Sequence, residues 1–229
     1  EKKLFIFLNF FGSMATTEKK GNAGGAGVLK FLFVSLESLS GDIAWQLTKE
    51  GHEVKCWIKA KSDADVYNGF VEKVEKWEEW VEWSDVVIFD DVEFGETAEK
   101  LRKKGKAVIG GSVYTDRLEI DREFGQAELK KYGITVLPNW NFSNYEEAIG
   151  FVRANPSRYV FKPSGNTPSG GKGLLFIGEE EDGKDLLEML DQNKNVWQKK
   201  APVFQLQKYV SGVEVAVGAF FNGTDFILP

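Results

Sequence analysis

The chain has 229 residues, of which 42% are hydrophobic and 28% are charged, as is typical of a folded globular protein. Its 35 acidic residues outnumber its 29 basic residues, and the net charge of −6 argues against binding of nucleic acid or an anionic membrane over its whole surface. One cysteine excludes an internal disulfide and one histidine argues against a zinc site or a Ser-His-Asp triad, so we expect a cytoplasmic protein.

The first 27 residues are expected to be a tag or a disordered linker. The apolar run from Leu4 to Phe11 is shorter than the roughly eighteen residues that a membrane-spanning helix needs. The tripeptide Gly12-Ser13-Met14 resembles a protease-site scar followed by an initiator methionine, although a short native β segment or a partner peptide remains an alternative for residues 1–13. Residues 15–27 are polar and end in glycines, as flexible linkers do.

From residue 28 the hydrophobic pattern predicts alternating strands and helices, which is typical of a parallel sheet with helices on both faces. The strands are expected at 28–36, 53–59, 85–89 and 107–109, and the helices at 40–50 and 97–104. The segment 71–83 is mixed, because its first part alternates like a strand whereas Trp77 and Trp80 fit one helical face. These elements predict an N-terminal α/β domain over residues 28–113.

Residues 114–229 show a different pattern, which predicts an α+β unit with antiparallel strands. Helices are expected at 115–132, 145–153 and 185–192, and strands at 134–137, 159–162, 174–177, 203–208, 213–221 and 224–228. Ser143 and Glu146 have the spacing of a capping box at the start of the second helix. Asn222-Gly223 is a typical hairpin turn between the last two strands.

A glycine-rich loop covers residues 163–173 and follows a strand that ends in Lys162. Glycines let backbone N–H groups approach anionic oxygens, and lysines neutralise their charge, so the loop has the composition of a phosphate cradle. It is not a Walker A loop, because its spacing differs and a strand is expected after it. A long hairpin turn that needs glycine only for flexibility is the alternative.

The order of several motifs carries a resemblance to a known superfamily. In sequence they are Gly110 to Phe124, Val160-Phe161-Lys162, the glycine loop, Leu206 to Val210 and Ser211 to Val215. This succession resembles the ATP-grasp superfamily, and within it is most similar to phosphoribosylamine–glycine ligases over residues 28–229. The resemblance implies a Rossmann-like pre-ATP-grasp domain over residues 28–113, followed by a partial ATP-grasp domain over residues 114–229.

The same resemblance implies which residues bind ATP. Lys162 matches a strand lysine that contacts the phosphates, and Arg122 stands where the family usually has another ATP-binding lysine, so the charge is kept with a different geometry. The loop residues that close over the phosphates are Ser169, Gly170, Gly171 and Lys172. The hinge residues whose backbone reads adenine are Gln207, Lys208, Tyr209 and Val210, of which the first two replace the acidic pair that the family often has. Glu214 matches the acid that accepts hydrogen bonds from the ribose hydroxyls.

As a member of this family the protein would be an ATP-dependent carboxylate–amine ligase that acts through an acyl phosphate and joins an amino acid to an amine. The cofactors implied are ATP and Mg²⁺, and the family's metal ligands lie beyond the point that matches Pro229. We therefore expect the chain to be inactive alone and assign it neither catalytic nor metal-binding residues. Two alternatives are a non-catalytic module that binds a nucleotide or a partner, and a ligase that acts on another amine.

Each assigned residue also has a simpler interpretation. Glu214 alternates with Val213 and Val215, so its side chain would fit the solvent face of a strand. Lys162 and Lys172 would then be solvated surface charges. The single cysteine, Cys56, lies between apolar residues and is interpreted as a core position.

Overall fold

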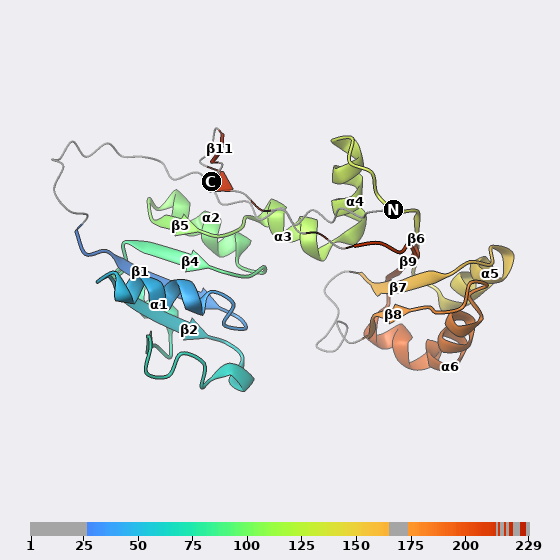
Figure 1. Cartoon of the computed structure of the whole chain (residues 1–229), viewed down its shortest axis with the longest axis horizontal. Coiled ribbons are helices and arrows are strands. Elements are labelled where there is room, and N and C mark those ends of the chain that lie inside the picture. The colour runs from blue at the N-terminus through green and yellow to red at the C-terminus, as the bar shows by residue number, and fades with distance from the viewer. Residues whose placement is uncertain are drawn as a thin grey trace. The chain divides into compact units, whose positions relative to one another are not determined.

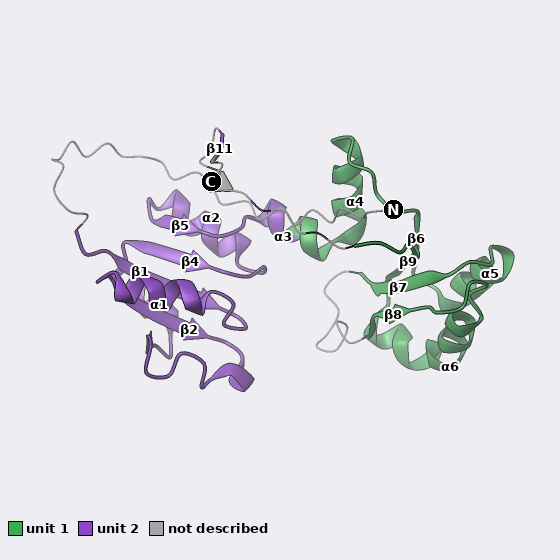
Figure 2. Cartoon of the chain, viewed as in Figure 1, with its two compact units in different colours: residues 1–5, 117–215 green, residues 6–116, 216–229 purple. Residues whose placement is uncertain are grey.

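The computed structural model describes residues 27–164 and 174–213, together with 215, 218, 220–221 and 225–227 (Figure 1). The chain divides into two compact units (Figure 2). Unit 1 contains the described residues of 117–215, and unit 2 contains those of 27–116 and 216–229. In the described part of the chain, no helix is long and apolar enough to cross a membrane.

Unit 2 is built on a five-stranded parallel sheet with the strand order β3-β2-β1-β4-β5. The strands are β1 (Lys30–Ser35), β2 (Glu53–Ile58), β3 (Glu72–Lys73), β4 (Val86–Phe89) and β5 (Ala107–Ile109). The helices are α1 (Gly41–Lys49) and α2 (Gly95–Lys103), and two 3₁₀ turns lie at η1 (Lys61–Asp63) and η2 (Trp77–Trp80). The predicted parallel sheet is therefore confirmed.

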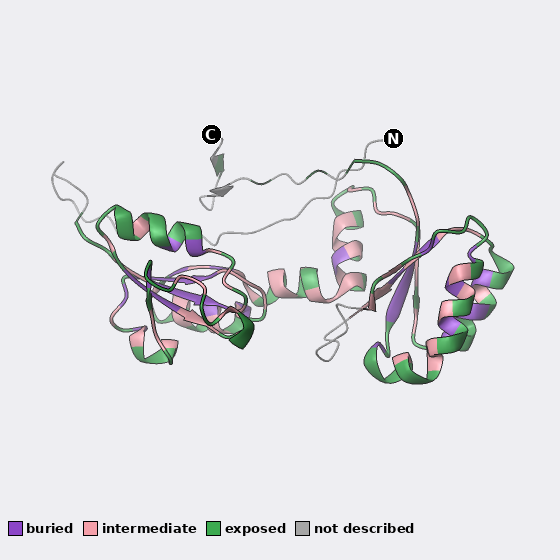
Figure 3. Ribbon diagram, turned by 60° about the horizontal axis from the view of Figure 1, so that its bottom comes forward, coloured by how far each residue is buried: buried purple, intermediate pink, exposed green. Residues whose placement is uncertain are grey.

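The sheet of unit 2 has a hydrophobic core on each face, because strands buried on both sides carry apolar residues at successive positions. On one face Phe33 and Cys56 pack with Ala44 of α1, and on the other Val34 and Phe89 pack with Ala98 of α2. Figure 3 shows this burial in the strands. The core position predicted for Cys56 is confirmed, and burial raises the pKa of its thiol to about 12.

The mixed segment 71–83 forms the short strand β3 and the 3₁₀ turn η2. Its alternating, strand-like pattern comes first and its helical pattern of tryptophans follows, so the two patterns belong to separate elements. Trp77 and Trp80 pack against the core on the α2 face of the sheet. The ammonium group of Lys55, which is buried, lies 4.0 Å from the ring centroid of Trp80 and pairs with Glu72. These tryptophans therefore pack on the sheet from a 3₁₀ turn.

Unit 1 contains a four-stranded antiparallel sheet with the strand order β6-β9-β7-β8. The strands are β6 (Asn139–Phe142), β7 (Tyr159–Pro163), β8 (Phe176–Ile177) and β9 (Phe204–Lys208). The helices near it in sequence are α3 (Val113–Ile120), α4 (Arg122–Lys131), α5 (Tyr145–Ala154) and α6 (Lys184–Lys200). Near the C-terminus, β10 (Phe220–Phe221) and β11 (Phe226–Ile227) pair antiparallel, whereas the predicted turn at Asn222-Gly223 lies outside the described residues.

One face of the sheet in unit 1 is apolar and is covered by α5 and α6. Phe161 of β7 and Leu206 of β9 pack there with Ile149 of α5 and Leu190 of α6, and all four are buried. The predicted α6 ended at residue 192, but the helix continues to Lys200 because Trp197 adds a further contact with this core.

Two further sequence predictions in unit 1 are wrong. The single helix predicted at 115–132 is two helices, because the backbone of Asp121 is extended and its carboxylate accepts a hydrogen bond from Phe124 N at 3.0 Å. The strand predicted at 134–137 is not formed, and β6 begins instead at Asn139. In β6 the residues alternate between polar and aromatic, so the asparagines lie on one side of the sheet and the aromatic residues on the other.

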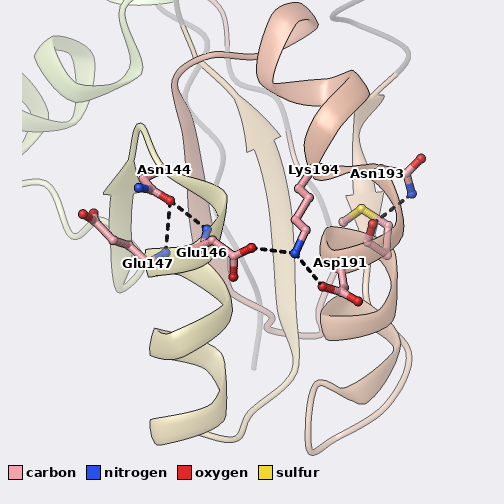
Figure 4. Close-up of polar contacts among 7 residues, drawn as sticks. Asn144, Glu146, Glu147, Asp191, Asn193 and Lys194 are labelled. Atoms are coloured by element: carbon pink, nitrogen blue, oxygen red, sulfur yellow. Dashed lines mark hydrogen bonds and ion pairs between the residues drawn. The ribbon is translucent and has the colours of Figure 1, made fainter.

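The N-cap of α5 is Asn144 and not the predicted Ser143. The side-chain Oδ1 of Asn144 accepts hydrogen bonds from the backbone N–H groups of Glu146 at 2.8 Å and Glu147 at 3.4 Å (Figure 4). The figure also shows Lys194 of α6 between Glu146 and Asp191, but these exposed ion pairs add little to stability. The amide cap is thus the main polar stabilisation at this end of α5.

We expect Asn144→Ala to lower the free energy of unfolding by about 0.5–2 kcal/mol, because two N–H groups lose their acceptor. Asn144→Ser should restore most of this loss, and Asn195→Ala, at an exposed position of α6, is the control. Urea denaturation measures all three variants. An Asn144→Ala midpoint equal to that of the control would contradict the capping role.

Candidate nucleotide-binding site

The second face of the sheet in unit 1 is polar, and it carries one of the predicted phosphate-binding residues. In β9, Phe204 and Leu206 point to the core, so Gln205 and Gln207 point to the opposite face, although both glutamines are buried. Lys162 of β7 lies directly opposite Gln205 in the antiparallel pairing. Since directly paired residues share a face, Lys162 lies on the polar face.

Two asparagines of β6 complete this polar face. Asn139 pairs with Gln207 and Asn141 pairs with Gln205. The side-chain Nε2 of Gln205 donates to Asn141 Oδ1 at 2.9 Å and to Asn139 Oδ1 at 3.2 Å. The face thus presents carboxamide groups beside the lysine. These groups are hydrogen-bonded to one another around the buried amide of Gln205.

Helix α4 is attached to the same face. Gln126 of α4 and Gln205 of β9 exchange two hydrogen bonds between their side-chain amides, each 2.8 Å long. Helix α4 also approaches α3 closely, because a side chain at Gly125 would come within 2.4 Å of the carbonyl oxygen of Leu118. The contacts with β9 and with α3 therefore fix the position of α4 relative to the sheet.

Arg122, the first residue of α4, is the second predicted phosphate-binding residue that the structure places here. Its Nε donates a hydrogen bond to the carbonyl oxygen of Pro163 at 2.8 Å. Burial lowers the pKa of the guanidinium group, but an arginine still carries its charge at neutral pH. Pro163 follows Lys162 directly, so the structure brings Arg122 to the strand end that carries Lys162, just before the glycine loop.

The predicted hinge begins at the other end of β9. Lys208 is exposed and its backbone N–H donates to Pro138 O at 2.9 Å, while the N–H of Tyr209 donates to Arg158 O at 3.0 Å. The guanidinium carbon of Arg158 lies 3.5 Å from the ring centroid of Tyr209, and its Nε donates to Gly178 O. Main-chain and stacking contacts therefore fix this segment, which continues into the half-buried Val210.

Five predicted site residues lie outside the described residues. These are Ser169, Gly170, Gly171, Lys172 and Glu214. Of the other six, the structure brings Arg122 and Lys162 together at the end of β7 and places Gln207 on the polar face. Lys208, Tyr209 and Val210 follow at the end of β9.

Comparison with known proteins gives this arrangement a context. No family model matches the chain. The chain is 30% identical over 130 residues to a phosphoribosylamine–glycine ligase of Methanocorpusculum labreanum, an alignment that covers 56% of this chain and 28% of that enzyme. A phosphoribosylamine–glycine ligase of Streptococcus suis is 28% identical over 142 residues, which are 61% of this chain and 33% of the enzyme. This chain thus spans about a third, or less, of the length of these curated relatives.

The fold is shared with solved structures of the same group. The phosphoribosylamine–glycine ligase of Thermotoga maritima superposes with a TM-score of 0.56 at 18% identity, over 81% of this chain and 45% of that one. The N5-carboxyaminoimidazole synthetase of Staphylococcus aureus, solved with ADP, gives 0.56 at 16% identity, over 80% of this chain and 48% of the other. The chain has the fold of ATP-grasp enzymes. Part of it is homologous to phosphoribosylamine–glycine ligases.

The resemblance to ATP-grasp enzymes implies Mg²⁺ as a cofactor. In the part that the structure describes, three or more His, Cys, Asp or Glu side chains do not gather anywhere as a metal ion would require. The described residues therefore do not fit Mg²⁺ as protein ligands.

Sequence reasoning missed four amide side chains of unit 1. They are Gln126, Asn139, Asn141 and Gln205. The alternation in Phe204-Gln205-Leu206-Gln207 signals a strand with one polar face, and the alternation in β6 gives the same signal. Nothing in the sequence of α4 marks Gln126, because its partner is 79 residues away.

Proposed function

We propose that the polar face of unit 1 binds ATP, and that the protein acts as an ATP-dependent carboxylate–amine ligase of the phosphoribosylamine–glycine ligase type. The observation that carries the proposal is the convergence of Arg122 and Lys162 at the end of β7, directly before the glycine loop. The partial identity with phosphoribosylamine–glycine ligases and the ADP in the S. aureus relative support it.

The two basic side chains would neutralise the phosphates. An ammonium group acts as a compact point charge, whereas a guanidinium group can donate two parallel hydrogen bonds to phosphate oxygens. Loop residues Ser169 to Lys172 would close over the same phosphates, with glycines allowing backbone N–H groups to approach them. The protein's contribution would therefore be positioning and charge neutralisation, which dominate catalysis of phosphoryl transfer.

The nucleoside would lie toward the end of β9. From Gln205, opposite Lys162, to Lys208 the strand advances roughly 10 Å, so the phosphate and hinge residues lie at opposite ends of one strand. The backbone of residues 207–210 would read the adenine, and Glu214 would accept hydrogen bonds from the ribose hydroxyls. A nucleotide bound along β9 would thus reach from Arg122 and Lys162 to the hinge residues 208–210.

The reaction proposed is the activation of a carboxylate, which attacks the terminal phosphate of ATP to give an acyl phosphate and ADP. An amine then displaces phosphate and forms the amide. Mg²⁺ bound to ATP would supply further charge neutralisation in this chemistry. We propose that the substrates are two small molecules of the cytoplasm, an amino acid and an amine, as in purine synthesis.

Calorimetry with ATP and inorganic triphosphate tests the proposal. The chain should bind both ligands, and Glu214→Gln should weaken ATP roughly tenfold while leaving triphosphate unchanged, because only ATP carries a ribose. Glu188→Gln, an exposed change on α6, is the control. Absence of ATP binding by the unaltered chain would refute the proposed function, and equal losses for both ligands would refute the ribose role of Glu214.

A further inference from the structure

Gln205 is an unusual residue for the centre of a strand, since its side chain is completely buried. A buried carboxamide costs free energy unless its donors and acceptor are satisfied, whereas a leucine at the same place would carry no such cost. Here the amide is satisfied by Gln126, Asn139 and Asn141 together. The cluster therefore has a role that apolar packing would not fill, because its hydrogen bonds are directional and connect α4 to the sheet.

The cluster fixes the orientation of α4. Gln126 and Arg122 are four residues apart, so they lie on the same side of the helix. Gln126 is attached to β9 through Gln205, and Arg122 is attached to the end of β7 through Pro163. Two directional contacts one turn apart determine both the rotation of α4 about its axis and its position along the sheet.

This orientation decides how Arg122 faces a phosphate. Its Nε is used in the hydrogen bond to Pro163, so the two Nη groups are the ones that can form a parallel pair of hydrogen bonds to phosphate oxygens. Bidentate pairing depends on the angle of the guanidinium plane, which a small rotation of α4 would change. A lysine at this position would not need such control, because its ammonium group is a point charge.

We propose that Gln126 and Gln205 are positioning residues, which hold α4 so that the guanidinium group of Arg122 pairs with the terminal phosphates of ATP. The proposal rests on the proposed function of this face as an ATP site. Neither glutamine touches the nucleotide; each acts through Arg122.

The test is triphosphate binding by five variants of the whole chain, measured by calorimetry. Gln126→Leu and Gln205→Leu should each weaken triphosphate roughly tenfold, and the double variant should lose no more than either one, because the pair acts as a unit. Adenosine affinity should stay unchanged in all of them. In the Arg122→Ala variant, adding Gln126→Leu should cause no further loss, because the residue that is positioned has been removed.

Gln198→Leu on α6 is the matched control, since Gln198 also donates one side-chain hydrogen bond, to Ser143 O at 3.1 Å, but does so far from the polar face in the fold. It should bind triphosphate like the unaltered chain. Should Gln205→Leu fail to fold, Gln126→Asn gives the same test, because an amide that is one methylene shorter cannot reach Gln205.

The outcomes separate the two proposals. If the unaltered chain binds neither ATP nor triphosphate, the ATP site itself is refuted and the positioning role falls with it. If the chain binds triphosphate and the glutamine variants bind it equally well, or lose further affinity in the Arg122→Ala background, only the positioning role is overturned. A loss that is equal for adenosine and triphosphate would indicate a merely structural role and would also overturn it.

Discussion

Replacing Phe161 by alanine is expected to lower the free energy of unfolding of unit 1 by about 3–5 kcal/mol, the usual cost of removing a buried aromatic ring. Phe161 is completely buried, and its ring centroid lies 4.8 Å from that of Phe204 and 5.2 Å from that of Trp197. The side chain thus links β7, β9 and α6 in one core. Since a domain is typically stable by only about 5–15 kcal/mol, the change removes a large part of that margin.

Amide hydrogen exchange in α5 and α6 measures this effect within unit 1. Exchange there should accelerate strongly in Phe161→Ala, whereas Val196→Ala, which shortens a side chain that is 54% exposed, should leave it unchanged. Equal protection in the two variants would show that the core does not depend on Phe161.

Lys162→Ala is the change with the largest expected effect on ligand binding. Removal of a charged donor to phosphate should cost about 1.5–3 kcal/mol, which is roughly a 10- to 100-fold loss of triphosphate affinity. The loss should shrink at high salt, because partly exposed charges are screened. Calorimetry at two salt concentrations measures both effects, with Lys199→Ala on α6 as the control. An affinity equal to that of the control would remove the phosphate role from Lys162.

The sequence predicted the parallel sheet of unit 2 well, because there each element has one hydrophobic period. The strands β1, β4 and β5 are short apolar runs, and glycines with positive φ follow α1 and α2 at Gly51 and Gly105. Local pattern and tertiary structure agree in such a segment. The 71–83 segment was ambiguous because a strand period and a tryptophan face follow each other within thirteen residues.

The prediction of unit 1 was less accurate, since there tertiary contacts decide between local alternatives. The helical pattern over 115–132 contains Asp121, and whether an aspartate interrupts a helix or lies on its surface depends on the fold around it. Likewise, Ser143 and Asn144 are both suitable N-caps, and in the structure Asn144 has the extended backbone and the side-chain hydrogen bonds of the cap.

The candidate site shows the same limit. Lys162 and Arg122 could be named from the resemblance to ATP-grasp proteins, but their meeting at Pro163 depends on a contact across 41 residues. The partnership of Gln126 and Gln205 has no local signal at all. A buried amide cluster is specified by residues distant in sequence, so a single sequence shows its members only as scattered polar residues.

The strict alternation in β9 has a consequence for folding fidelity. A slip of β9 by one residue against its neighbours would turn Gln205 and Gln207 into the apolar core and bring Phe204 and Leu206 to the polar face. Each unsatisfied amide would cost about 1–3 kcal/mol and each exposed apolar side chain about 1.5–3 kcal/mol. The four penalties together approach the stability of a whole domain. A fold with β9 out of register is therefore much less stable than the native one. Refolding of unit 1 should proceed without a slow phase from register errors at β9.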